Sequence, residues 1–271
     1  MKKVLIHLII VILVLFSTLT GCTQDVSNIE ETGELVFVAN GEDFTRKGFV
    51  TKDGWKINFD HIYVTLADIT AYQTNPPYDA HSGEEIKGQN KVVLNGIKTV
   101  DLAKGDENAD PIFVGKLDSV PVGHYNAISW KIVKGTEGEA KDNVFVFIGT
   151  AEKNGKKIKF NIKLNKEYRF LAGEYIGDER KGIVEKGKSA DLEMTFHFDH
   201  LFGDIEVAGT DSLNQDALGF QPFAELAENG IVDADMTKLK SKFTTEEFSK
   251  LINILSGIGH VGEGEGYGEE I

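Results

Sequence analysis

The chain has 271 residues, a single cysteine and a formal net charge of −14. This acidic balance disfavours nucleic acid as a partner, because phosphates are bound by basic surfaces. One cysteine cannot form a disulfide within the chain, and it cannot build a cysteine-rich zinc site or an iron–sulfur cluster. Stability must therefore come from the hydrophobic core. Once the cysteine is acylated, as predicted below, no free thiol remains, and any metal must be held by nitrogen and oxygen atoms.

The N-terminal segment has the pattern of a secretory signal. Lys2 and Lys3 precede an almost wholly apolar run over residues 4–16, which is too short to cross a bilayer core of about 30 Å. The sequence Leu-Thr-Gly-Cys that ends at Cys22 resembles a bacterial lipobox, whose cysteine is diacylated at sulfur and becomes the mature N-terminus. We predict a lipoprotein signal peptide over residues 1–21 and lipidation of Cys22. The alternative is an ordinary secretory signal that ends near a cysteine.

Residues 22–32 are short, polar and acidic, and we predict that they form a tether between the lipid and the folded part. Two or three acyl chains of the palmitate type anchor a protein durably, because each buried methylene contributes about 0.8 kcal/mol. We therefore expect an exported protein that is attached to the membrane through its N-terminal lipid. It would lie on the outer face of the plasma membrane, or on the outer membrane of a Gram-negative cell.

Residues 33–203 are predicted to form an antiparallel β-sandwich of the transthyretin-like or immunoglobulin-like kind. β-branched and aromatic residues recur there with a period of two, which is typical of strands. The expected strands cover residues 35–38, 61–66, 91–94, 112–117, 125–133, 144–151, 157–164 and 190–198. Asn154-Gly155 predicts a hairpin with a type I′ turn, and Trp130 is expected in the core. Many short strands without interleaved helices favour a sandwich over an α/β sheet.

Residues 204–260 are predicted to form a small helical appendage. Pro222 marks the first turn of a short helix, and Thr244-x-x-Glu247 is a capping box for a longer one. The apolar residues at positions 248, 251, 252 and 255 fall on one face of that longer helix. The Gly/Glu-rich segment 261–271 is predicted to be a flexible tail.

Two patterns of nucleotide-binding proteins occur in the wrong context. Residues 182–189 fit G-x-x-x-x-G-K-S, but the residues that follow alternate as in a strand, whereas a phosphate loop needs a helix there. Residues 257–262 fit G-x-G-x-x-G at the end of a predicted helix, not at a strand-to-helix turn. We predict no nucleotide cofactor. Since no hydrolase or zinc-peptidase motif and no nucleophile–base pair can be named, we also predict that the protein is not an enzyme.

Histidines near two strand ends are the candidate metal ligands. The triplet Phe-Asp-His occurs twice, ending at His61 and at His200, and His197 precedes the second triplet. In the last predicted strand, residues 193, 195, 197 and 199 share the face opposite the apolar residues. Two imidazoles and the Asp199 carboxylate converge on one cation if the chain bends after Asp199. His61 supplies a third nitrogen if its strand lies beside this one.

Imidazole nitrogen and carboxylate oxygen suit Zn²⁺, Cu²⁺ or Ni²⁺. We therefore predict a site for zinc or copper with the ligands His61, His197, Asp199, His200 and His260. His260 lies in a glycine-rich segment and would be a mobile ligand, and the aspartates could orient the rings instead of binding the ion. The alternative is that these are ordinary polar residues at strand ends, whose hydrogen bonds pin two strands together.

Part of the chain resembles an uncharacterised family of bacterial and archaeal lipoprotein domains. The resemblance rests on the sequence Val-Asp-Leu at residues 100–102, the Pro-x-Gly-x-Tyr-x-x-Ile pattern over residues 121–128, and the strand-like segment 62–71. It covers about residues 33–135 and implies a β-sandwich. The chain is also similar, through short strands and scattered histidines, to the periplasmic metal-binding proteins that accompany methanobactin. Neither resemblance carries over a catalytic residue.

These patterns predict an envelope lipoprotein that binds a divalent or transition-metal cation for capture or delivery. Its expected partners are the membrane, the metal ion and an envelope transporter or partner protein, with no nucleic acid. The alternative from a different class is a structural or adhesive envelope module that binds protein or glycan without a metal.

Overall fold

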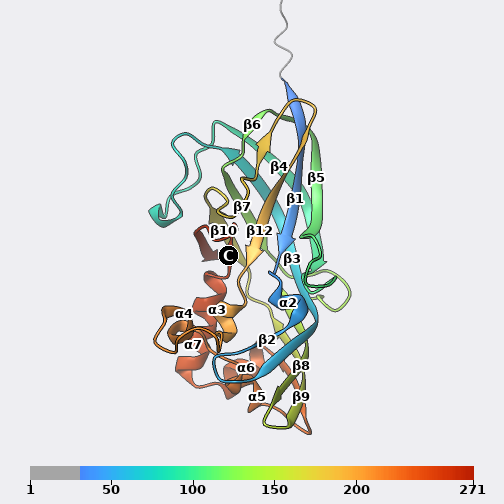
Figure 1. The fold of residues 1–271 in the computed structure, drawn as a ribbon, viewed down its shortest axis with the longest axis vertical. Helices are drawn as coiled ribbons and strands as arrows, with labels where there is room; N and C mark the ends of the chain where they lie inside the picture. Colours follow the sequence, from blue (N-terminus) through green and yellow to red (C-terminus); the bar gives the residue numbers. More distant parts are fainter. Residues whose placement is uncertain (1–30) are drawn as a thin grey trace, which may run out of the picture. The chain divides into compact units, whose positions relative to one another are not determined.

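The computed structural model describes residues 31–271, and residues Thr32–Ile271 form one compact unit. The predicted signal peptide, the predicted lipidation at Cys22 and nearly all of the predicted tether lie outside the described residues. In the described part, we find no helix with the length and apolar character that a membrane span requires. The unit is mainly β, with two large sheets and several short helices (Figure 1).

The larger sheet has nine strands, in the order β13-β9-β8-β3-β7-β10-β15, and β2 and β4 also pair with β3. The strands are β2 (Phe49–Val50), β3 (Lys56–Gln73), β4 (Asn90–Asp101), β7 (Ala127–Ile132), β8 (Phe145–Lys153), β9 (Lys156–Leu164), β10 (Tyr168–Ala172), β13 (Ile231–Asp235) and β15 (Gly266–Glu270). The long strand β3 organises this sheet. It pairs with β8 along its first half, and with β4 and β7 along its second.

The smaller sheet has four strands, in the order β14-β12-β1-β5. They are β1 (Thr32–Asn40), β5 (Ile112–Pro121), β12 (Ser189–Phe196) and β14 (Gly259–His260). β1 is parallel to β12 and antiparallel to β5. Two further strands, β6 (Gly123–His124) and β11 (Ile183–Val184), form a separate two-stranded sheet.

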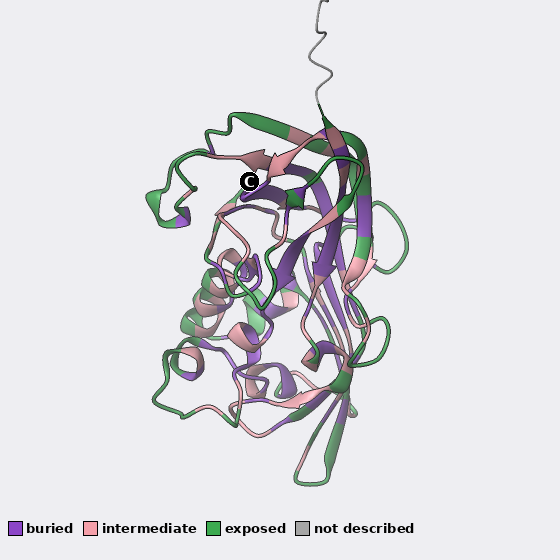
Figure 2. Ribbon diagram, turned by 45° about the horizontal axis from the view of Figure 1, so that its top comes forward, coloured by how far each residue is buried: buried purple, intermediate pink, exposed green. Residues whose placement is uncertain are grey.

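Aromatic side chains from the two large sheets meet in one core. Phe147 of β8 contacts Phe198, just beyond β12, edge to face, with 5.2 Å between ring centroids. Phe145 contacts Phe196 in the same way at 5.8 Å. Trp130 of β7 is fully buried, as predicted, and packs against Phe196. Such pairs add about 0.5–1.5 kcal/mol each beyond their burial, and the strands around them are buried accordingly (Figure 2).

Both large sheets are mixed, although the sequence predicted antiparallel pairing throughout. The parallel pairs are β1 with β12 and β13 with β9. Their partners are far apart in the chain, so no hairpin turn fixes the strand direction. The predicted hairpin is confirmed, because β8 and β9 pair up to Lys153 and Lys156. Asn154 and Gly155 between them both have positive φ, as a type I′ turn requires.

The C-terminal region contributes strands to the larger sheet as well as helices. Its helices are α4 (Ser212–Asp216), α5 (Gln221–Ala224), α6 (Met236–Lys242) and α7 (Thr245–Ser256). The capping box of Thr244 and Glu247 is confirmed at the start of α7, and Leu251 and Leu255 are buried. However, β13 lies among these helices and pairs with β9. Residues 204–260 are therefore not a purely helical appendage.

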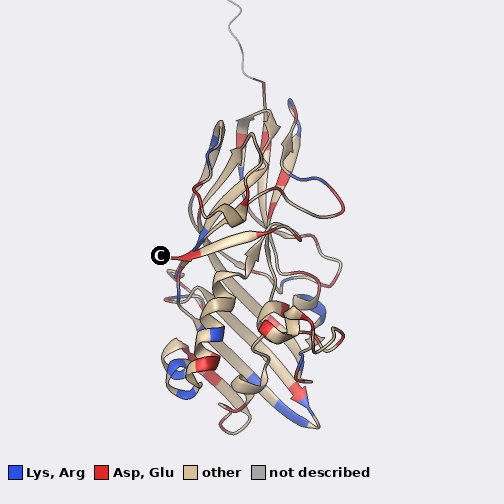
Figure 3. Cartoon of the chain, turned by 90° about the vertical axis from the view of Figure 1, so that its left-hand side faces the viewer, with Lys and Arg blue, Asp and Glu red and all other residues tan. Residues whose placement is uncertain are grey.

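The Gly/Glu-rich segment 261–271, predicted to be a flexible tail, contains strand β15 at the edge of the larger sheet. β15 pairs with β10 from Gly266 to Glu270 (Figure 3). Its glycines are required by close packing, because a Cβ atom at Gly266 or Gly268 would overlap a backbone carbonyl oxygen. Glycine in a strand often marks such a close approach. The many glycines of segment 261–271 therefore reflect the lack of space for larger side chains there.

The segment with the phosphate-loop pattern joins two strands. Residues 182–189 contain β11, a turn and the first residue of β12. The strand predicted to follow this pattern is thus confirmed.

Candidate metal centre

Strand β12 carries a polar face that is itself buried. Its apolar residues at positions 192, 194 and 196 face the core, as the alternation predicts. On the other face, Glu193, Thr195 and His197 are also at most 6% exposed. Gly262 lies against this face, and its N–H donates a 2.8 Å hydrogen bond to Thr195 Oγ1. These polar groups are buried with partners, as stability requires.

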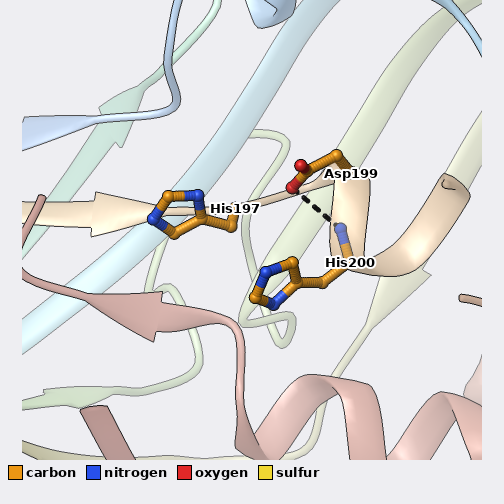
Figure 4. Close-up of side chains that lie close together, drawn as sticks. All are labelled: His197, Asp199 and His200. Carbon is orange, nitrogen blue, oxygen red and sulfur yellow. Dashed lines mark hydrogen bonds between the residues drawn. The ribbon is translucent and has the colours of Figure 1, made fainter. Parts of the chain in front are cut away.

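A tight turn after β12 brings three of the predicted ligands together. Phe198 stays in the core while the chain enters the single-turn helix α3 (Asp199–Phe202), so Asp199 and His200 lie beside His197 (Figure 4). The donor atoms of these three side chains all lie within 4.8 Å of one another. The His197 and His200 rings are stacked, with 5.3 Å between centroids. An Asp199 oxygen also accepts a 2.9 Å hydrogen bond from the backbone N–H of His200.

His197 has a different partner at each ring nitrogen. Nε2 lies 3.0 Å from the Gly262 carbonyl oxygen, which can only accept a hydrogen bond, so Nε2 carries a proton. Nδ1 lies 3.2 Å from Glu42 Oε2. Burial acts to lower the pKa of His197, but the Glu42 carboxylate outweighs it and raises the pKa to about 9. This raised pKa favours the protonated ring at neutral pH, beside the Glu42 carboxylate.

The pKa of His200 is shifted in the opposite direction to that of His197. Burial is the largest influence on its pKa and lowers it, and the neighbouring rings of His260 and His197 lower it further, against the effect of Asp199. Neutral imidazole is the form that binds a metal ion. His200 is thus ready to act as a ligand in the structure as it stands.

His260 lies against the group but engages both of its nitrogens elsewhere. Its ring is 4.7 Å from the His197 ring and 5.3 Å from the His200 ring, centroid to centroid. Its Nδ1 lies 3.0 Å from the Gly264 carbonyl oxygen, and its Nε2 lies 2.8 Å from that of Gly257. These contacts hold the turn between α7 and β15. The predicted ligand His260 is therefore a packing neighbour of the group in this structure.

The structure does not bring His61 to the group. His61 lies on β3, where Nδ1 is 2.7 Å from Asp101 Oδ2 and the ring stacks on Tyr63. Its side chain is 46% exposed. A register shift in β3 after Phe59 places Asp60 and His61 in consecutive exposed positions while Phe59 stays in the core. Both copies of the Phe-Asp-His triplet thus anchor a phenylalanine in the core, but only the second copy places its histidine in the group.

A pocket of about 710 Å³ opens beside the group. Residues of α4 and α7 line it together with His200 and Gly257. Asp216 and Glu246 contribute carboxylates to its wall. His200 therefore links the buried His197 to a cavity through which a hydrated cation can approach.

Sequence patterns did not point to Glu42 or to the Gly262 carbonyl group. Both are distant from β12 in the chain. Glu42 follows β1, whose last residue, Asn40, pairs with Thr195 of β12 in the parallel register. Only knowledge of that pairing would have identified the carboxylate beside His197.

No family model matches the chain, and comparison with curated proteins and with solved structures gave no match. The resemblances described from the sequence therefore remain predictions.

Proposed function

We propose that this protein is an exported, lipid-anchored protein that binds a divalent transition-metal cation, such as zinc, through His197, Asp199 and His200. The observation that carries the proposal is the convergence of these donor atoms within 4.8 Å, at a turn between a strand and a helix. Two imidazoles and a carboxylate are a donor set suited to Zn²⁺ or Cu²⁺. The protein would be a binding protein for metal capture or delivery, without a catalytic role.

The contacts around His197 support this proposal. Histidines that bind metal ions usually donate their second ring N–H to a carboxylate or a backbone carbonyl, which fixes the ring and its tautomer. The Nε2 contact with the Gly262 carbonyl oxygen has this form. It leaves Nδ1 as the nitrogen that would bind the ion once its proton is released.

The cellular location that we propose follows from the sequence. Lipidation at Cys22 would hold the protein at the outer face of the plasma membrane, or on the outer membrane, where an envelope transporter or partner protein could exchange the ion. The β-sandwich architecture is part of the same proposal. The aromatic contacts between β8 and the end of β12 support it, whereas the parallel pairs depart from an antiparallel transthyretin-like or immunoglobulin-like arrangement.

A zinc titration tests the function. We expect the full chain, purified in detergent without a histidine tag, to bind one Zn²⁺ in calorimetry. At free zinc a hundredfold above Kd, the free energy of unfolding should rise by about 2.7 kcal/mol. The double variant His197→Ala/His200→Ala should lose both effects, and His81→Ala, at an exposed histidine outside the group, should keep them.

Equal isotherms for the wild type and the double variant would refute the metal site. The alternative, a structural or adhesive envelope module, would then stand. It is favoured by the contacts that the histidine rings make with backbone carbonyl groups, namely that of His197 with Gly262 and those of His260 with Gly257 and Gly264.

A further inference from the structure

The proposed site has three donors, and zinc sites built entirely from protein ligands have four. An additional side chain that can donate is Glu42, whose Oε2 lies 3.2 Å from Nδ1 of His197. It is not one of the three residues whose donor atoms lie within 4.8 Å of one another. Its role therefore depends on how it is held and on what its carboxylate contacts.

The backbone around Glu42 is held in an unusual conformation. Glu42 lies between β1 and the short helix α2 (Phe44–Lys47), with φ at 63°, a region that residues other than glycine rarely adopt. Its N–H donates a 2.9 Å hydrogen bond to Asn40 Oδ1, and Asn40 Nδ2 donates one of 2.9 Å to Glu193 Oε1 of β12. The pairing of β1 with β12 thus holds the residue beside His197.

One oxygen of the Glu42 carboxylate, Oε2, is buried and poorly satisfied, although the side chain as a whole is 24% exposed. Within the part of the chain that the structure describes, Oε2 accepts no hydrogen bond of acceptable geometry, and its close contact is the 3.2 Å approach of His197 Nδ1. A buried carboxylate oxygen usually has a partner. Two ligands of a tetrahedral Zn²⁺ at bond lengths near 2.0 Å are separated by about 3.3 Å. The observed separation therefore fits two ligands of one ion.

We propose that Glu42 is the fourth ligand of the site, which makes the cargo a divalent cation held by two nitrogens and two oxygens. This inference rests on the proposed function. A bound Zn²⁺ would lie between Glu42 Oε2 and His197 Nδ1, which are 3.2 Å apart, and any proton held on Nδ1 would leave to solvent. Two neutral imidazoles and two carboxylates carry a charge of −2, which balances the ion.

The same donor set discriminates against copper in its reduced state. Cu⁺ is selected by thiolate and thioether sulfur, and no sulfur atom belongs to the group among residues 31–271. Met194 of β12 points into the core, away from the polar face. The site should therefore take Zn²⁺ and leave Cu⁺ unbound.

The variant Glu42→Gln tests this ligand, because it keeps the size of the side chain and removes its charge. Asp43→Asn is the matched control, since it removes one charge at the neighbouring residue, whose half-exposed carboxylate pairs with Lys47. We expect Glu42→Gln to weaken Zn²⁺ binding at least tenfold in calorimetry, and Asp43→Asn to bind as the wild type does. The Co²⁺-loaded protein should show a changed d–d absorption spectrum in Glu42→Gln only.

The possible outcomes separate this inference from the proposed function. If the wild type binds Zn²⁺ and Glu42→Gln binds it equally well, Glu42 is only the ionic partner of His197 and the inference fails alone. It also fails if affinity falls but the Co²⁺ spectrum is unchanged, because Glu42 then acts from outside the coordination sphere. Tight binding of buffered Cu⁺ by the wild type would contradict the assigned cargo. If the wild type binds no Zn²⁺, both proposals fail.

Discussion

Tyr168 shows how burial sets the chemistry of a single residue. Its side chain on β10 is 1% exposed, and its hydroxyl donates a 3.3 Å hydrogen bond to the Ile252 carbonyl oxygen of α7. Burial, with a smaller effect of Glu270, raises the pKa of Tyr168 to about 12. The phenol is therefore neutral in the folded protein at pH values where an exposed tyrosine is already ionised.

We expect this residue to make folding stability depend on alkaline pH. Its contribution is fully present below about pH 10, the pKa of an unfolded tyrosine, and is lost as the pH rises through 12. The loss should approach about 3 kcal/mol, because each pKa unit corresponds to about 1.4 kcal/mol. Urea unfolding between pH 9 and pH 12 measures it.

Two variants separate the contribution of Tyr168 to the pH dependence of stability from that of the other tyrosines. Tyr168→Phe should be less stable at pH 9 by about 1 kcal/mol, the usual contribution of one hydrogen bond, and should show a flatter decline above pH 10. Tyr267→Phe, at a 44% exposed position, should keep the wild-type decline. An unchanged slope in Tyr168→Phe would show that the phenol is accessible to water.

Among the elements, β15 depends most on glycine. A Cβ atom at Gly268 would meet the Ser256 carbonyl oxygen and the ring of Phe170. Arg169 on β10 contacts Glu269 across the strand pair at 3.2 Å. The same guanidinium donates from Nη1 and Nη2 to the two carboxylate oxygens of Glu85, with two N–O distances of 2.6 Å. The strand is thus held by backbone pairing, close packing and an ion-pair cluster.

We predict that Gly268→Val destabilises the protein by about 2 kcal/mol or more, because overpacking a tight contact costs about 1–3 kcal/mol. The control is Gly209→Val, since Gly209 has open space around its Cβ position and no positive φ. Thermal unfolding should show a clear decrease of Tm for the first variant and almost none for the second. Equal Tm values for the two variants would mean that β15 is loosely attached.

Elements with long local patterns were predictable from the sequence, and those defined by distant contacts were not. The strand over residues 157–164 has strict alternation and a turn signal before it, and it was found. β10 and β13 have five residues each and were not predicted, because their pairing with β7 and β9 joins segments that are separate in the chain. His197 and His200 were found together because they are neighbours in the chain. Glu42 was not, because only the pairing of β1 with β12 brings it near.

At the scale of the whole molecule, charge over the described residues 31–271 is distributed without a dominant basic region. Acidic residues occur on strands, helices and loops, with basic residues among them (Figure 3). This charge distribution and the net charge of −14 give the protein little electrostatic attraction to anionic lipid. Attachment to a membrane should therefore depend on acyl chains rather than on electrostatics.

Lipidation at Cys22 can be tested with the substitution Cys22→Ser. The wild type should partition into the detergent phase and incorporate labelled palmitate. The variant should incorporate none, and any chain whose leader is removed by other proteases should be found in the aqueous phase. Palmitate labelling of Cys22→Ser, or its retention in the detergent phase after removal of the leader, would show that another feature anchors the protein.

The position of β1 has a mechanical consequence. This strand follows the proposed tether directly, and it is hydrogen-bonded on both sides, to β12 and to β5. Tension on the lipid anchor would pull along the strand, so that its inter-strand hydrogen bonds bear the load in shear and together. β1 ends at Asn40, whose side chain accepts a hydrogen bond from the Glu42 N–H. A force applied to the tether would therefore act on the proposed cation site before it acts on the larger sheet.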